Sequence, residues 1–199
     1  MQFETTKRFI LASQSPRRRE LLAQLGIDFT VQSADVEETS VPFETPAQYV
    51  RDVALLKTRA IQSEDVVIGS DTIVVQNGRL LHKPKNVEEA YAHLRALSGH
   101  THEVMTAVAI KEGTKEVTFV ETVRVTFYKL NDALIEAYVA TGDPFDKAGG
   151  YGIQTDGAFF VEKIDGDYLA VVGLPLARLT QTLLAENWLA LTTKNSAKA

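Results

Sequence analysis

Residues 9–25 read FILASQSPRRRELLAQL, which places a short apolar strand directly before a polar loop and a helix. The same alternation of strands and helices continues along the chain. Further expected strands cover residues 29–31, 66–75, 80–81, 104–111, 117–128 and 158–164, and further expected helices cover residues 47–61, 87–97, 131–141 and 175–191. Because βα units come first and hairpins lie in the middle, this order predicts an α/β fold with a mixed twisted sheet and flanking helices.

Length and composition narrow the possibilities further. The 199 residues contain no repeat and no linker long enough to separate independent units, so we expect a single domain over residues 1–191 and a frayed tail at 192–199. With no cysteine, thiolate chemistry and cysteine-ligated zinc are excluded. The net charge of −5 argues against a nucleic-acid partner. The lack of a signal peptide or a long apolar run predicts a cytoplasmic protein that does not enter a membrane.

Three arginines, Arg17 to Arg19, crowd the start of the first helix. Ser15 is a good N-cap and Pro16 suits the first helical position, so free backbone N–H groups point out beyond the preceding strand. The helix dipole already places partial positive charge there, and more like charge is unfavourable unless an anion occupies the site. The pattern therefore predicts a phosphate-binding helix start. The alternative is a solvated first turn whose arginines pair with Glu20 or neighbouring acids.

A polar Ser-Asp-Thr triplet at residues 70–72 interrupts the apolar run over residues 66–75. If this run is one buried strand, Asp71 is a carboxylate at the edge or in the interior of the sheet. Burying an ionised carboxylate is costly unless cations, a metal or hydrogen bonds compensate. Such a residue is a candidate general base or metal ligand. The alternative is a tight turn over residues 69–72 in which Asp71 binds local backbone N–H groups.

A glycine-rich stretch, DPFDKAGGYGIQ, occupies residues 143–154. Its glycines allow the backbone to pass close to a ligand, Lys147 supplies a cation, and the Gln154 amide can donate and accept at once. The order of these residues matches neither a Walker loop nor a dinucleotide-binding fingerprint. A mobile surface loop is the alternative interpretation.

The histidines do not form an obvious metal site. His100 and His102 would share one face of a strand, but no third ligand is nearby, so we expect exposed strand histidines rather than zinc ligands. His93 lies on a charged helix and is expected to be solvated.

Other charged residues fit a surface or a site equally well. The pair Glu37 and Glu38 is typical of solvated surface, yet it also offers the carboxylates that magnesium requires near phosphate. Lys57 and Lys83 are equally ambiguous. Together with the helix start and Asp71, these groups form the inventory of phosphoryl chemistry, which needs cations, a divalent ion and a carboxylate. The sequence therefore predicts a nucleotide hydrolase.

The chain resembles the Maf (septum formation inhibitor) family in four segments: LASQSPRR at residues 11–18, IGSDT at 68–72, Lys83-Pro84 and DKAGGYGIQ at 146–154. They occur in family order, and the resemblance covers about residues 9–190. It implies an inosine-triphosphatase-like α/β architecture with an active-site cleft between two lobes. It also implies a house-cleaning nucleoside triphosphate pyrophosphatase that cuts between the α and β phosphates with a divalent metal cation, Mg²⁺ or Mn²⁺, and that forms a homodimer.

Carried over by position, the resemblance implies roles for single residues. Asp71 matches the family's proposed catalytic base. Arg17, Thr72 and Gln154 match the positions that separate substrate subgroups, and this combination resembles the subgroup acting on dTTP and UTP. Phosphate is implied to bind at Ser13, Ser15, Arg18, Lys57, Lys83 and Lys147, and the metal at Asp71, Glu37 and Glu38.

Two other functions compete with this expectation. One is a non-catalytic nucleotide-sensing regulator of septum formation, and the other is an enzyme whose substrates are modified nucleotides. Elementary chemistry supports a pyrimidine substrate, because the Gln154 amide can pair with the adjacent O4 acceptor and N3–H donor of uracil or thymine. Cytosine presents the reverse order, which a flipped amide would also meet.

Overall fold

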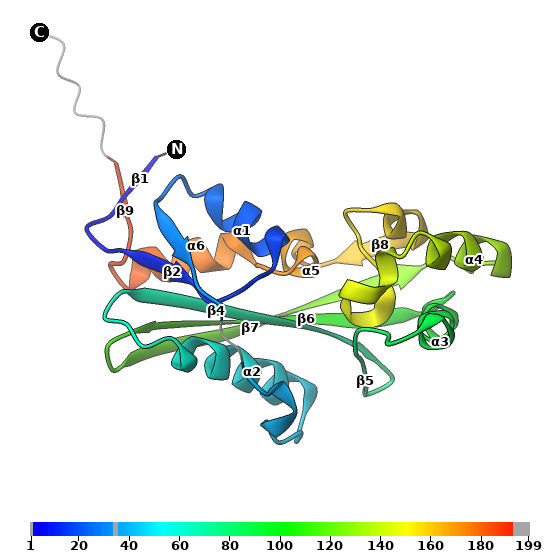
Figure 1. Ribbon diagram of the computed structural model, residues 1–199. Helices are drawn as coiled ribbons and strands as arrows, with labels where there is room; N and C mark the ends of the chain where they lie inside the picture. Colours follow the sequence, from blue (N-terminus) through cyan, green and yellow to red (C-terminus); the bar gives the residue numbers. More distant parts are fainter. Residues whose placement is uncertain (1, 34–35, 193–199) are drawn as a thin grey trace, which may run out of the picture.

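The computed structural model describes residues 2–33 and 36–192. Its main sheet has the strand order β3-β2-β4-β6-β7-β8, and β5 pairs with β4 beside this path (Figure 1). The strands are β1 (Phe3–Glu4), β2 (Phe9–Leu11), β3 (Phe29–Val31), β4 (Val66–Gln76), β5 (Arg79–Leu81), β6 (Thr101–Glu112), β7 (Lys115–Phe127), β8 (Val161–Asp165) and β9 (Ala190–Leu191). β2 pairs in parallel with β3 and β4, whereas the β4-β6-β7-β8 run is antiparallel. The predicted α/β fold with a mixed sheet is confirmed.

Helices flank the sheet on both faces. They are α1 (Pro16–Ala23), α2 (Pro46–Ala60), α3 (Val87–Leu97), α4 (Asp132–Ala140), α5 (Tyr168–Val172) and α6 (Leu176–Ala185). α2 covers one face, while α1 and α6 lie on the other (Figure 1). α3 and α4 gather at the far end of the long strands, and β4, β6 and β7 run between the two ends (Figure 1). These strands therefore join two lobes.

β4 is one continuous strand rather than two strands with a turn at residues 69–72. Its residues are almost all buried, and alternate side chains face opposite sides of the sheet, as pleating requires. Gly69 and Asp71 face α2, whereas Ser70 faces the other layer and donates to the Gly173 carbonyl at 3.2 Å. The strand thereby carries a carboxylate into the space beside α2.

The end of the chain differs from the sequence-based expectation. The expected strand at 158–164 begins later, because Asp156–Phe160 forms a 3₁₀ turn before β8. The expected closing helix stops at Ala185, and β9 then pairs with β1. α5 was not expected. The expected tail lies outside the described residues except for Thr192, whose N–H donates to the Gln2 carbonyl at 3.0 Å.

Among the described helices, none combines the length and apolar character that a membrane crossing requires.

Candidate active site

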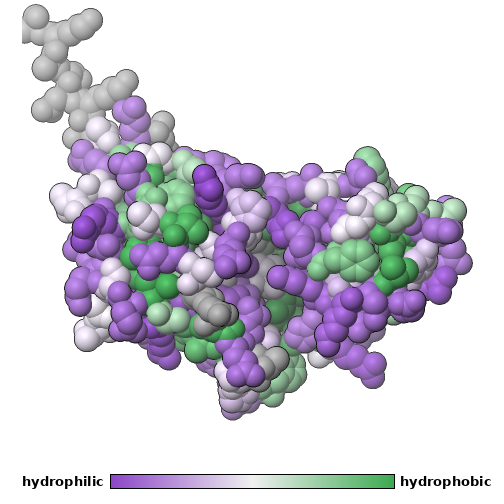
Figure 2. Space-filling model, viewed as in Figure 1, coloured by the Kyte–Doolittle hydropathy of each residue, from purple (hydrophilic) through white to green (hydrophobic). Residues whose placement is uncertain are grey.

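A cavity of about 940 Å³ lies between the two lobes, where the surface is hollowed (Figure 2). Most of the sequence-predicted site residues line it: Ser15, Arg17, Arg18, Glu38, Lys57, Asp71, Thr72, Lys83, Lys147 and Gln154. Two others, Ser13 and Glu37, belong to the described part of the chain but lie outside this lining. The structure therefore brings the arginine-rich helix start and Asp71 to one cavity.

The start of α1 is built as the sequence predicts. The Ser15 hydroxyl accepts from the Arg18 backbone N–H at 3.5 Å, and Pro16 occupies the first turn. The Arg18 guanidinium turns back into the protein, where Nε donates to the Gly173 carbonyl at 2.9 Å and Nη2 donates to Thr72 Oγ1 at 3.0 Å. Desolvation lowers the pKa of Arg18, although the nearby Asp71 carboxylate acts to raise it. Arg18 therefore fixes the helix start to β4.

Ser13 and Thr72 both contact Arg18, although only Thr72 also lines the cavity. The buried Ser13 hydroxyl lies 3.4 Å from Arg18 Nη1 and accepts from the Ser15 N–H at 3.2 Å. Thr72 Oγ1 also lies 2.9 Å from Thr106 Oγ1. Ser13 was predicted to contact phosphate and Thr72 to separate substrate subgroups. In the structure, both side chains help to position the Arg18 guanidinium.

Asp71 and Lys57 form a largely buried ion pair in the cavity lining. Lys57 on α2 places its ammonium 2.7 Å from Asp71 Oδ1 and 2.7 Å from Glu38 Oε1. The Lys57 and Asp71 side chains are only 14% and 11% exposed, whereas that of Glu38 is 47% exposed. Burial raises the pKa of the neighbouring Tyr49, and the charges of Asp71 and Glu38 raise it further. The cation offsets the cost of burying Asp71.

The donor set fits a hard divalent cation in combination with a phosphate. Within residues 2–33 and 36–192, no cluster of three or more histidine, aspartate or glutamate side chains is arranged to hold a metal. Mg²⁺, however, is commonly held by one or two carboxylates together with substrate phosphates. Asp71 and Glu38 supply two carboxylates that already converge on one positive charge, the Lys57 ammonium.

The glycine-rich stretch forms the opposite wall of the cavity. Gly149 and Gly150 have φ values of 72° and 75°, a region that favours glycine, and the Gly149 N–H donates to the His82 carbonyl at 3.3 Å. Lys83 and Gln154 are exposed at the cavity, while Lys147 is held by two aspartates. The stretch is thus packed against the chain at the cavity wall, and its contact with a ligand stays a prediction.

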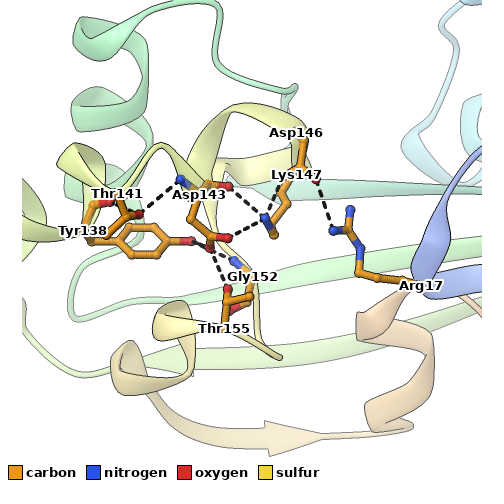
Figure 3. Close-up of polar contacts among 8 residues, drawn as sticks. All are labelled: Arg17, Tyr138, Thr141, Asp143, Asp146, Lys147, Gly152 and Thr155. Atoms are coloured by element: carbon orange, nitrogen blue, oxygen red, sulfur yellow. Dashed lines mark hydrogen bonds and ion pairs between the residues drawn. The ribbon is translucent and has the colours of Figure 1, made fainter. Parts of the chain in front are cut away.

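A polar network around Lys147 was not identified from the sequence (Figure 3). It joins Arg17 and Lys147 to Asp143 and Asp146, and it continues to Tyr138 on α4. Both aspartates belong to the glycine-rich stretch at residues 143–154. Their spacing, Asp-x-x-Asp-Lys, does not indicate which carboxylate the lysine contacts.

The expectation of exposed strand histidines is wrong for His102. It is 2% exposed, its Nε2 lies 2.8 Å from the Tyr151 hydroxyl, and its ring packs edge-on against Phe127. Burial lowers its pKa to about 4. His93 is only partly exposed and lines the cavity, so it is not simply solvated. β6 begins at Thr101, earlier than the expected residue 104, so His102 lies in the strand whereas His100 precedes it. The sequence did not reveal which face of β6 is covered.

Comparison with known proteins gives matches over most of the chain. Residues 8–186 match a family described as Maf-like protein. A dTTP/UTP pyrophosphatase of Bacillus cytotoxicus is 50% identical over 180 residues, which cover 89% of this chain and 94% of the relative. A dTTP/UTP pyrophosphatase of Bacillus cereus is 48% identical over 183 residues, 90% of each chain. The structure of the Staphylococcus aureus Ham1 protein is 17% identical with a TM-score of 0.44, covering 61% of this chain and 72% of that one.

Proposed function

Because this chain belongs to the Maf family, we propose that it is a nucleoside triphosphate pyrophosphatase that hydrolyses dTTP and UTP. The products are the nucleoside monophosphate and pyrophosphate. The observation that carries the proposal is the shared cavity, in which the Arg17 side of α1 and the Asp71 carboxylate both face the same space. A polyphosphate in this cavity would touch both.

In the proposed reaction, Asp71 takes a proton from the water that attacks the α-phosphorus. The bond from that phosphorus to the oxygen of the β-phosphate breaks, and pyrophosphate leaves. Lys57, 2.7 Å from Asp71 Oδ1, holds the carboxylate in place. Arg17, Lys83 and Lys147 are the cations that we assign to the phosphates, since positive groups aimed at developing charge stabilise phosphoryl transfer.

A divalent cation, Mg²⁺ or Mn²⁺, is part of the proposal. Asp71 and Glu38 would hold it with the substrate phosphates, and Glu37 lies outside the cavity lining. When bound, the ion neutralises phosphate charge. This chain's own contribution is the pair of carboxylates and the Lys57 ammonium between them.

We assign recognition of the substrate's pyrimidine ring to Gln154, whose exposed side chain lines the cavity. Its amide can accept from the N3–H group of uracil or thymine and donate to O4. Arg17 and Thr72 also stand at subgroup-separating positions, and Thr72 acts through its contact with Arg18. Modified pyrimidine nucleotides that keep O4 and N3–H fit the same proposal.

The decisive experiment is a triphosphate panel that measures pyrophosphate and orthophosphate separately. With Mg²⁺, we expect pyrophosphate from UTP and dTTP, and a chelator should stop its release. Asp71→Asn should reduce the rate by about 10² to 10⁴, as loss of a general base commonly does, without changing the circular dichroism spectrum. Release of orthophosphate instead, or an active Asn variant, contradicts the assignment. Tight UTP binding without turnover would support the nucleotide-sensing alternative.

Two further expectations stay predictions: the homodimer that the family resemblance implies and the cytoplasmic location that the sequence indicates. Sedimentation velocity measures the first, and fractionation of cells measures the second.

A further inference from the structure

The ammonium of Lys147 is fully engaged by two aspartates. Its Nζ donates to the backbone carbonyl of Asp143 at 2.8 Å, to Asp143 Oδ1 at 2.8 Å and to Asp146 Oδ1 at 2.6 Å (Figure 3). A lysine ammonium has three hydrogens, so these contacts use its whole donor capacity. A phosphate can bind Lys147 only if one of the three acceptors leaves.

The two carboxylates differ sharply in how firmly they are held. The Asp143 side chain is 20% exposed, and its Oδ2 accepts from the Tyr138 hydroxyl at 2.5 Å and from Thr155 Oγ1 at 2.6 Å. Burial works to raise the pKa of Asp143, but hydrogen bonds from Lys147, Thr155 and Tyr138 outweigh it and lower the pKa. The Asp143 carboxylate is therefore anchored from three directions.

Asp146 is the looser partner. Its side chain is 63% exposed, and besides Lys147 it contacts Arg17, whose Nη1 lies 3.2 Å from Oδ2 (Figure 3). Arg17 and Lys147 come from opposite lobes and meet on this one anion. A substrate phosphate offers the same two cations the same kind of acceptor with more charge.

The stem of Lys147 is also confined. A Cβ added to Gly152 would lie 2.5 Å from Lys147 Cε and 2.4 Å from Thr155 Oγ1, so the lysine and Thr155 both pack on this glycine. The Gly152 N–H in turn donates to the Tyr138 hydroxyl at 3.0 Å. The position of the ammonium thus depends on Asp143 and on the groups that hold Asp143.

We propose that Asp143 is a positioning residue that keeps the Lys147 ammonium at the cavity wall for phosphate, while Asp146 is the partner that a phosphate displaces. The proposal rests on the proposed function, because it takes Lys147 as a phosphate contact. It assigns different roles to the carboxylates of Asp143 and Asp146, which the family resemblance did not do.

The two roles predict effects of opposite sign. Removing any carboxylate near an anion site should, by simple charge, strengthen anion binding. Asp146→Asn follows that rule, and because the group is exposed its effect is modest, an affinity gain of about two- to threefold. Asp143→Asn breaks the rule, because the ammonium loses its anchor, and affinity should fall about tenfold.

The test measures binding of inorganic pyrophosphate with Mg²⁺ by calorimetry, alongside KM and kcat for UTP. Asp143→Asn should weaken pyrophosphate binding and raise KM about tenfold with a smaller change in kcat, whereas Asp146→Asn should lower KM. In a Lys147→Met background, Asp143→Asn should no longer weaken pyrophosphate binding, because no ammonium is left to lose its anchor, whereas a merely structural role would weaken binding in both backgrounds. Tighter binding in both aspartate variants, or an undiminished Asp143→Asn effect without Lys147, overturns the proposal.

A second variant covers the case in which Asp143→Asn does not fold. Thr155→Val keeps the shape of an exposed side chain and removes one donor to Asp143, so pyrophosphate binding should weaken about threefold. Unchanged binding in this folded variant overturns the proposal. The proposed function is judged separately, by whether the wild-type protein releases pyrophosphate from UTP.

Discussion

Asp71 is a carboxylate within a strand whose other residues, except the terminal Gln76, are apolar or small, and it is only 8% exposed. Its Oδ1 lies 2.7 Å from the Lys57 ammonium, which also touches Glu38. A buried carboxylate costs free energy that a single well-placed cation offsets. The same ammonium therefore has two duties, stability of the fold and orientation of the reactive carboxylate.

Replacing Lys57 with methionine should reduce stability and change how the chain responds to Mg²⁺. Without the ammonium, Asp71 and Glu38 would repel each other beside α2, and the free energy of unfolding should fall by about 3 kcal/mol. Urea denaturation measures the loss, and Lys83→Met, an exposed lysine of the same cavity, is the control. Mg²⁺ should restore more stability to Lys57→Met than to the wild type if the two carboxylates bind it. Equal Mg²⁺ responses would contradict the metal assignment.

The buried His102 should make the free energy of unfolding fall as the pH is lowered. Burial lowers its pKa from an ordinary 6.5 to about 4, so between these values the unfolded chain binds more protons than the folded one. Acidification through this window therefore favours unfolding, and the full difference corresponds to about 3 kcal/mol. His102→Gln should lack this part of the decline between pH 7 and pH 4, measured by urea denaturation at each pH. The exposed His100→Gln is the control, and an identical decline in His102→Gln would contradict the prediction.

At the level of elements, the site depends on how closely α2 lies on β4. A Cβ added to Gly69 of β4 would stand 2.1 Å from Thr58 Oγ1 and 2.8 Å from the Ala54 carbonyl, both on α2. Lys57 neighbours Thr58, and Asp71 lies two residues beyond Gly69 on the same face. The glycine thus permits the approach that brings Lys57 to Asp71.

Gly69→Ala should push α2 away from β4. We expect a loss of about 2–3 kcal/mol in unfolding free energy, the usual cost of overpacking, together with reduced UTP hydrolysis. Adding Thr58→Ala removes the 2.1 Å contact but leaves the Ala54 carbonyl, so stability should recover only in part. Full stability of the single variant would show that the helix and strand can separate without cost.

Elements with strong local signals were predictable, and those set by distant partners were not. Ser15, Asn86 and Asn131 cap helices as their residue types indicate, and Asn77 takes the positive φ of a hairpin turn. The closing helix was predicted too long, because Asn187 adopts a φ of 60° and Trp188 donates to Glu112 at 2.7 Å. That contact spans 76 positions and leaves no periodic trace in the sequence.

At the scale of the whole molecule, the cavity exists because the long strands carry groups from both lobes to its walls. The sequence indicated the groups on α1 and β4 because each breaks a local rule, like charge at a helix start and a carboxylate in an apolar strand. It did not indicate Tyr138, whose hydroxyl reaches Asp143 only after α4 is packed. A residue such as Tyr138, which positions another side chain, fits its local helix pattern. Sequence motifs therefore do not identify it.

Ligand binding across both lobes should stabilise the whole chain. With Asp71→Asn to prevent turnover, UTP and Mg²⁺ at 100 times Kd should add about 2.7 kcal/mol and raise Tm by about 5–10 °C. Differential scanning fluorimetry measures the shift, and omission of UTP is the control. No shift at saturating UTP would mean that the nucleotide does not bind the folded state.

The same measurement on the wild type separates an enzyme from a sensor. An enzyme converts UTP to products that lack the triphosphate, so the early shift in Tm should shrink with incubation time at a rate matching pyrophosphate release. A sensor leaves UTP intact, and its shift should persist for as long as the protein does. A chelator should stop hydrolysis, so that the UTP is not consumed. If the Tm shift then no longer shrinks with time, its decrease is caused by the reaction and not by loss of protein. A constant shift with Mg²⁺ present would favour the regulator and remove Asp71 from catalysis.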